Sequence, residues 1–151
     1  RPASDVETVK LGLADGTVDA IATDHAPHAP ESRDLPFDQA PPGMLGLQTA
    51  LALAVTELDL PLHLVLALLS WQPAALAGLD LPGGGAQGGP IVPGAPANLC
   101  VIDPTATWTV DPSALASRSR NTPYAGRRLT GQVRHTVFRG EPVVIDAVAQ
   151  R

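Results

Sequence analysis

Two hydrophobic patterns divide the chain. Over residues 1–80 the apolar side chains recur mainly at helical spacing, whereas residues 97–151 hold short apolar runs of strand length. The first pattern predicts helices over residues 45–58, 62–69 and 73–79. The second predicts strands over residues 99–102, 107–110, 133–138 and 142–145, with turns at 103–104 and 139–141.

The first twenty-five residues suggest a unit of a parallel α/β fold. Ser4 and Glu7 match a capping box, in which each side chain would satisfy a backbone N–H at a helix start. Apolar residues follow at helical spacing, and Asp15 and Gly16 are typical of a helix end. Residues 20–23 then form a short apolar run, so a helix, a turn and a buried strand are expected in that order.

Composition narrows the classes of function. The 151 residues carry a formal net charge of −5, which disfavours nucleic acid as a partner because phosphate binding requires a cationic surface. No apolar run reaches the length of a membrane span, so no membrane partner is expected. Cys100 is the only cysteine, which excludes a disulfide within the chain and mildly favours a cytoplasmic location.

Residues 81–96 are rich in glycine and proline and separate the two patterns. They lack the Gly-x-x-x-x-Gly-Lys pattern of a phosphate-binding loop, so a linker or wide turn is the better interpretation. Residues 29–42 form a second, polar and proline-broken loop. Loops of this length in compact domains tend to be functional or disordered.

Asp24, His25 and His28 form the densest cluster of side chains able to bind a metal or move protons. They follow the apolar run directly, and the carboxyl ends of strands carry the active site in α/β barrels. A carboxylate can ligate zinc or transfer protons, and imidazole can ligate a metal or hold an anion. On residue types alone the alternative is equally good: Asp24 caps a turn and both histidines are solvated.

Longer strings of residues favour the functional interpretation. Residues 21–28, Ile-Ala-Thr-Asp-His-Ala-Pro-His, closely resemble the signature at the eighth barrel strand of the dihydroorotase family. Residues 40–50, Ala-Pro-Pro-Gly-Met-Leu-Gly-Leu-Gln-Thr-Ala, are similar to the family's Ala-Pro-Phe-Gly-x-x-Gly-Leu-Glu-Thr-Ala. The block Ser-Arg-Asn-Thr-Pro-Tyr-Ala-Gly at 119–126 also fits, and these matches occur in the family's order.

The resemblance implies a fold and a domain arrangement. The fold class would be α/β, with the last part of a (β/α)8 TIM-like metal-dependent hydrolase barrel in residues 1–80. Residues 81–96 would be the linker, and residues 97–151 would supply C-terminal β strands of a small composite domain. The remainder of both parts would precede residue 1, together with most metal ligands, so we expect the chain alone to be inactive.

The resemblance also implies a reaction and the residues that serve it. The reaction would be hydrolysis of the dihydroorotate ring amide, or the reverse cyclisation of carbamoyl-aspartate, in pyrimidine biosynthesis with zinc as cofactor. Asp24 would ligate the metal and act as general base, and His28 would bind the substrate carboxylate. Pro42 and Gly43 would contact the substrate through their backbone, although Pro42 replaces the family's usual phenylalanine and brings no N–H.

Other interpretations remain open. A related cyclic amidohydrolase, such as an allantoinase or a hydantoinase, would have the same barrel and a different ring as substrate. A noncatalytic dihydroorotase-like subunit could instead scaffold aspartate transcarbamoylase, and a homo-oligomer is a further expectation. Six arginines without an intervening acid suggest docking against an acidic neighbour rather than nucleic-acid binding: Arg118, Arg120, Arg127, Arg128, Arg134 and Arg139.

Overall fold

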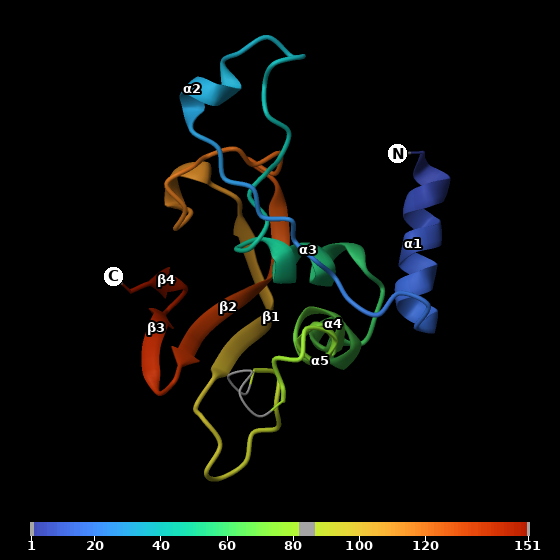
Figure 1. Ribbon diagram of the computed structural model, residues 1–151, viewed down its shortest axis with the longest axis vertical. Helices are drawn as coiled ribbons and strands as arrows, with labels where there is room; N and C mark the ends of the chain where they lie inside the picture. The colour runs from blue at the N-terminus through green and yellow to red at the C-terminus, as the bar shows by residue number, and fades with distance from the viewer. Residues whose placement is uncertain (1, 82–86, 151) are drawn as a thin grey trace.

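A computed structural model describes residues 2–81 and 87–150. Helices lie against one side of a four-stranded antiparallel sheet, and α1 stands at the edge opposite the sheet (Figure 1). The helices are α1 (Ala3–Asp15), α2 (Pro30–Arg33), α3 (Ala50–Glu57), α4 (Leu62–Leu69) and α5 (Trp71–Leu76), with a 3-10 turn η1 (Pro112–Ala114). The strands are β1 (Leu99–Thr109), β2 (Arg128–Phe138), β3 (Glu141–Ile145) and β4 (Val148–Ala149). None of the described helices is both long and apolar enough to cross a bilayer.

The sheet is a simple meander in which each strand pairs with the next, in the order β1-β2-β3-β4. The expected turn at residues 103–104 is wrong, because β1 continues through it with a register shift between Asp103 and Thr107. The Asp103 carboxylate accepts hydrogen bonds from the backbone N–H groups of Thr105 (2.9 Å) and Ala106 (3.0 Å). Those side-chain bonds satisfy donors that leave the ladder, so the strand bulges instead of turning.

Helix α3 packs on β2 and forms the small core between helices and sheet. The buried residues Ala52, Val110 and Leu129 make this cluster. A Cβ on Gly131 would lie 3.3 Å from Val55 of α3, and Gly131 has a φ of +94°. Only glycine meets both conditions without strain, and it lets the helix approach the strand closely.

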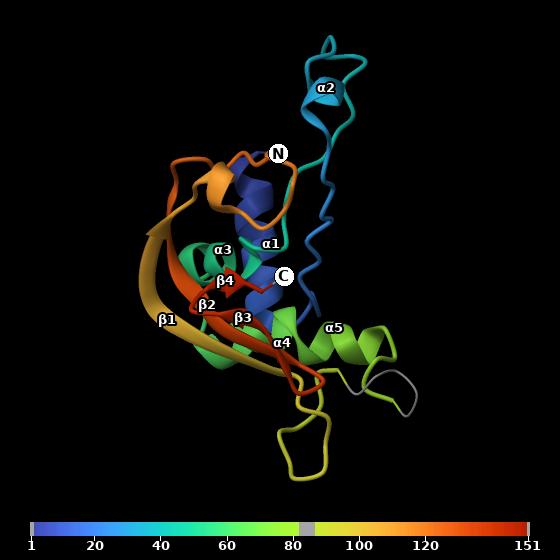
Figure 2. The same ribbon diagram turned by 90° about the vertical axis from the view of Figure 1, so that its left-hand side faces the viewer.

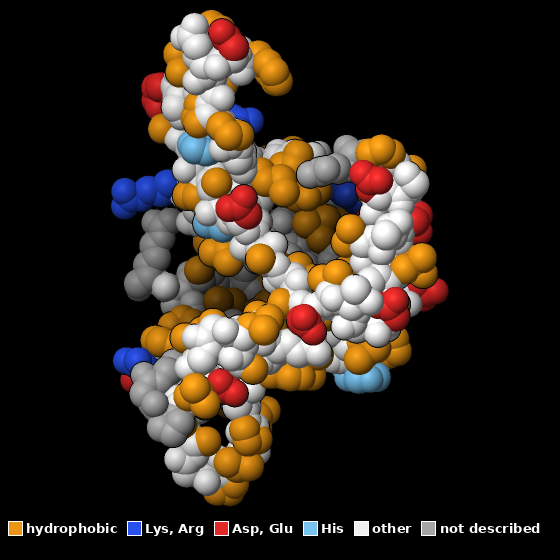
Figure 3. All heavy atoms as spheres, turned by 45° about the vertical axis from the view of Figure 1, so that its right-hand side comes forward, with side chains coloured by type: hydrophobic (Ala, Val, Ile, Leu, Met, Phe, Trp, Pro, Cys, Tyr) orange, Lys and Arg blue, Asp and Glu red, His pale blue; other side chains and the backbone are white. Residues whose placement is uncertain are grey.

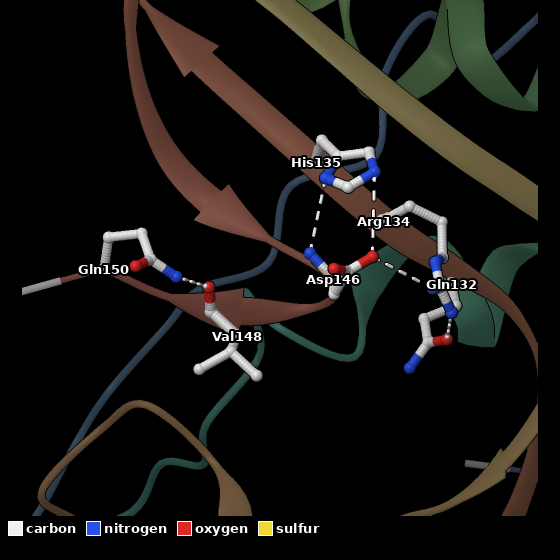
Figure 4. Close-up of polar contacts among 6 residues, drawn as sticks. All are labelled: Gln132, Arg134, His135, Asp146, Val148 and Gln150. Carbon is white, nitrogen blue, oxygen red and sulfur yellow. Dashed lines mark hydrogen bonds and ion pairs between the residues drawn. The ribbon is translucent and has the colours of Figure 1, made fainter.

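The last two strands are joined by a tight turn that β2 holds in place (Figure 4). Asp146 and Ala147 both have positive φ, at 49° and 66°. The Ala147 N–H donates to the Arg134 carbonyl (2.8 Å), and the Asp146 N–H donates to His135 Nδ1 (3.3 Å). His135 is therefore a turn-stabilising residue of the sheet. The sequence did not predict β4, which has only two residues.

Two expectations about the first segment need correction. The capping box is wrong: Pro2 is the N-cap of α1, so Ser4 lies inside the first turn and makes no cap hydrogen bond through its side chain. The helix does end at Gly16, in the left-handed conformation expected of a helix end. Residues 20–23 form no strand, because within the described chain they pair with no other strand; Ile21 N–H donates to Leu68 O of α4 (2.9 Å).

The other predicted elements match to differing degrees. Helix α4 has the predicted bounds, whereas α3 begins at Ala50, because residues 45 and 46 have no regular structure and residues 47–49 form a turn. Proline does occupy the first turn of α5, which starts two residues before the predicted range. The predicted linker lies partly outside the described residues, at 82–86, and its described part has no helix or strand.

Residues 29–42 form a long arm that projects from the body and carries α2 near its end (Figures 1 and 2). Its side chain Phe37 is fully exposed, and Leu35 is 45% exposed. In the space-filling view the arm stands away from the body with apolar side chains on its surface (Figure 3). The arm and the loop after η1 enclose the candidate site.

Candidate functional site

Asp24 lies at an open cavity of about 1080 Å³ between the arm and residues 120–123. Its side chain is exposed, and its backbone has a φ of +44°. Aspartate tolerates this left-handed conformation better than most residues, and strained backbone is often found at functional sites. The carboxylate is therefore accessible to a ligand or a metal from the cavity.

His25 fixes the loop that follows the arm. Its Nδ1 accepts hydrogen bonds from the backbone N–H of Gly46 (3.1 Å) and, more weakly, of Leu47 (3.4 Å). A parallel bridge also joins His25 to Met44, and Ala26 N–H donates to Met44 O (2.9 Å). Since Nδ1 supplies a lone pair, His25 is a neutral structural residue in this arrangement.

The His28 ring is held by a hydrogen bond to Pro42. Its Nε2 lies 3.0 Å from the carbonyl oxygen of Pro42. A carbonyl only accepts, so Nε2 carries a proton and donates it to Pro42. His28 Nδ1 is then the remaining polar atom of the ring: it accepts when the ring is neutral and donates when the ring is protonated.

Gly43 packs tightly against the segment that carries His25 and His28. A Cβ there would lie 2.6 Å from the Cβ of Ala26 and 2.9 Å from His28 Nε2, and φ is +135°. Its carbonyl accepts from Arg33 of the arm (3.0 Å) and from the Asn121 amide (3.3 Å). The carbonyls of Pro42 and Gly43 are thus bound within the chain. Among the described residues the Gly43 N–H has no hydrogen-bond partner, so this donor is the backbone group left for a ligand.

Asn121 connects the segments on either side of the site. Its Oδ1 accepts from the His28 N–H (3.2 Å), and its Nδ2 donates to Ala26 O (2.8 Å). Its backbone carbonyl also accepts from Leu45 N–H (3.0 Å). Sequence reasoning did not select this residue, although it lies inside the 119–126 block. The signal was present in that block, but nothing in the local pattern distinguishes Asn121 from its neighbours.

Zinc would find a suitable ligand in Asp24, because a carboxylate oxygen is an ordinary zinc donor and this one is exposed to the cavity. The two neighbouring histidines each use one ring nitrogen for the protein. No group of three potential ligands occurs among the described residues. The described chain therefore fits zinc with one side chain and does not complete a site.

The arginine-rich stretch is largely engaged within the chain. Arg120 donates to backbone carbonyls of its own loop, including Ser119 O (3.0 Å), and Arg127 pairs with Glu57 of α3. Arg134 pairs with Asp146 (3.2 Å), and Arg139 stacks over Phe138. These arginines fasten loops and strands to one another. Docking against an acidic neighbour remains an expectation.

No family model matches the chain. It is 45% identical over 150 residues to the dihydroorotase of Mycobacterium tuberculosis strain ATCC 25618 / H37Rv, covering 97% of the chain and 34% of that protein. It is 42% identical over 146 residues to the dihydroorotase of Geotalea daltonii, covering 95% of the chain and 33% of that protein.

Solved structures with the same fold are hydantoinases. The L-hydantoinase (dihydropyrimidinase) of Arthrobacter aurescens aligns with a TM-score of 0.85 and 25% identity, over 100% of the chain and 34% of that structure. The D-hydantoinase of a Thermus species aligns with a TM-score of 0.80 and 23% identity, over 95% of the chain and 32% of that structure. The fold is that of a C-terminal part of an amidohydrolase of the TIM-barrel type, as predicted. The chain spans about a third of the length of the relatives it matches.

Proposed function

Since this chain matches the C-terminal portion of dihydroorotases over nearly its whole length, we propose that it contributes the general base and part of the substrate site of a dihydroorotase. One observation carries the proposal: the chain that is similar to dihydroorotases also has the geometry described above at residues 24–43. Asp24 and Gly43 line the cavity, and the His28 ring lies directly behind Gly43, against it.

The proposed reaction is opening of the dihydroorotate ring amide by water, or its reversal. Water oxygen bonds to the ring carbonyl carbon while the carbon–nitrogen bond breaks. Asp24 takes a proton from the attacking water and returns it to the departing amide nitrogen, so protons balance within the site. Zinc, when bound, supplies Lewis acidity that lowers the pKa of bound water to about 7. Asp24 would be one of its ligands.

His28 and Gly43 would bind the substrate. The His28 ring donates Nε2–H to Pro42, so it would donate to a substrate carboxylate through Nδ1 whenever the ring is protonated. The Gly43 N–H adds a neutral donor from the opposing segment. Two donors on opposing segments suit an anionic ring substrate, which favours dihydroorotate over rings without a carboxylate.

The test compares two ring amides that differ by the carboxylate. The complete polypeptide in which this sequence occurs is purified with zinc and assayed with dihydroorotate and with dihydrouracil, which lacks that group. We expect kcat/KM to favour dihydroorotate by at least the roughly one to two decades that one charge-assisted hydrogen bond contributes. A preference for dihydrouracil would favour the hydantoinase alternative. Zinc-loaded protein inactive on both rings would favour a noncatalytic scaffold.

A further inference from the structure

Four hydrogen bonds converge on Asn121, and three of them use its side chain. The amide accepts from His28 N–H and donates to the carbonyls of Ala26 and Gly43, at distances of 3.2, 2.8 and 3.3 Å. The fourth joins its backbone carbonyl to Leu45 N–H. The segments that hold His28 and Gly43 are separated in sequence by the whole arm, and Asn121 contacts both.

Only a primary amide satisfies these partners together. One backbone N–H requires an acceptor, and two carbonyls require donors, which is the inventory of an asparagine side chain. An aspartate carboxylate in the same place would keep the bond to His28 N–H, but Ala26 O would lose its Asn121 donor and Gly43 O would keep only Arg33. A serine would offer one hydroxyl hydrogen for the two carbonyls.

The consequence for the site follows from what each partner does. Gly43 lies so close to the His28 ring that a Cβ would be 2.9 Å from Nε2. A shift of either segment therefore moves His28 relative to the Gly43 N–H. Misplacement of binding groups by about 1 Å costs on the order of 10²-fold in catalytic efficiency.

We propose that Asn121 is a positioning residue that fixes His28 and Gly43 relative to each other for ligand binding. It lines the cavity with Asp24 and Gly43, and in this role it acts through the backbones of Ala26, His28 and Gly43. This role rests on the proposed function, which supplies the substrate. It adds a residue outside segment 24–43 that determines the affinity for that substrate.

The experiment compares Asn121→Asp with Asn98→Asp in the complete, zinc-loaded polypeptide. Asn98 accepts from Arg139 N–H (2.9 Å) at the β2–β3 hairpin, so it offers the same substitution away from the site. We expect Asn121→Asp to raise KM for dihydroorotate by ~10–100-fold, with kcat per folded enzyme changed much less. Asn98→Asp should leave KM unchanged. Should Asn121→Asp yield too little folded protein, Asn121→Ser gives the same test without an added charge.

A purely structural role would give a different result. Thermal stability and the active fraction would then fall while KM stayed at the wild-type value, and that result would overturn the proposal. An equal rise of KM in Asn98→Asp would overturn it too. In a His28→Ala background, Asn121→Asp should raise KM by a smaller factor than in the wild type, because one of its targets has been removed. Fully multiplicative effects would also count against the proposal.

The outcome does not depend on the identity of the ring amide. If the wild-type protein hydrolyses dihydrouracil and not dihydroorotate, the proposed function fails, but KM for dihydrouracil can still be compared in both asparagine variants. If the wild type hydrolyses dihydroorotate and Asn121→Asp keeps its KM, the proposed function stands and the positioning role fails.

Discussion

The carboxylate of Asp24 is the side chain on which the proposed chemistry depends. Asp24→Asn keeps the size and removes the charge and the proton affinity, so kcat should fall by ~10²–10⁴-fold if Asp24 is the general base. KM should change less. Steady-state kinetics at matched zinc content measure both, and Asp19→Asn, an exposed carboxylate five residues earlier, serves as control. Near-normal kcat in fully metallated Asp24→Asn would place Asp24 outside the chemistry.

Substitution of His28 tests substrate binding separately from catalysis. Because His28 Nε2–H donates to the Pro42 carbonyl, Nδ1 is the ring atom left to bind an anion. His28→Ala should raise KM for dihydroorotate by roughly one to two decades, the worth of a charge-assisted hydrogen bond of ~1.5–3 kcal/mol. Zinc content, measured by elemental analysis, should stay constant; loss of zinc would make His28 a ligand.

The contrast between His28 and Asn121 shows what sequence alone reveals about single residues. Asp24 and His28 could be selected because they lie in one short string with a family signature. The roles of His25 and Asn121 depend on partners 21 and 93 residues away, in Gly46 and His28. Neither partner can be inferred from local pattern, since hydrogen bonds of this range are determined by the tertiary fold.

At the scale of elements, local signals succeed where an element is stabilised locally. Helix α4 was predicted with its bounds because its apolar run begins after Pro61 and ends before Ser70. Residues 20–23 have the composition of a strand, but a strand exists only when a neighbour pairs with it. The turn predicted at Asp103 is absent for a related reason. The Asp103 side chain accepts hydrogen bonds from the backbone N–H groups of Thr105 and Ala106, so the strand continues past them.

The contact between α3 and β2 offers a prediction about packing. Gly131→Ala places a Cβ 3.3 Å from Val55 at a φ of +94°, whereas Gly140→Ala has a similar φ of +87° and meets nothing within 4 Å. Both substitutions should lower the free energy of unfolding by about 1–2 kcal/mol, because alanine is strained in the left-handed backbone conformation. Gly131→Ala should lower it by about 1–3 kcal/mol more because of overpacking, so this variant should unfold at a lower denaturant concentration than Gly140→Ala. Equal midpoints would show that α3 adjusts without cost.

The whole molecule presents much apolar surface for its size. Exposed apolar side chains lie on α1, on the arm, on α5 and on β4, among them Val9 (55%), Phe37 (101%), Leu76 (69%) and Val148 (63%). No buried residue occurs in α1, although it is a thirteen-residue helix. Exposed apolar side chains in such number promote association.

The isolated chain should therefore behave differently from the complete polypeptide. We expect the purified 151 residues to self-associate, as measured by light scattering coupled to gel filtration, because the exposed apolar side chains gain more by mutual burial than by hydration. We also expect no dihydroorotate turnover with added zinc, since no group of three potential ligands occurs among the described residues and at least three protein ligands hold a catalytic zinc. A monomeric chain that hydrolyses dihydroorotate would contradict both expectations, because it would need a metal site that residues 2–81 and 87–150 do not form.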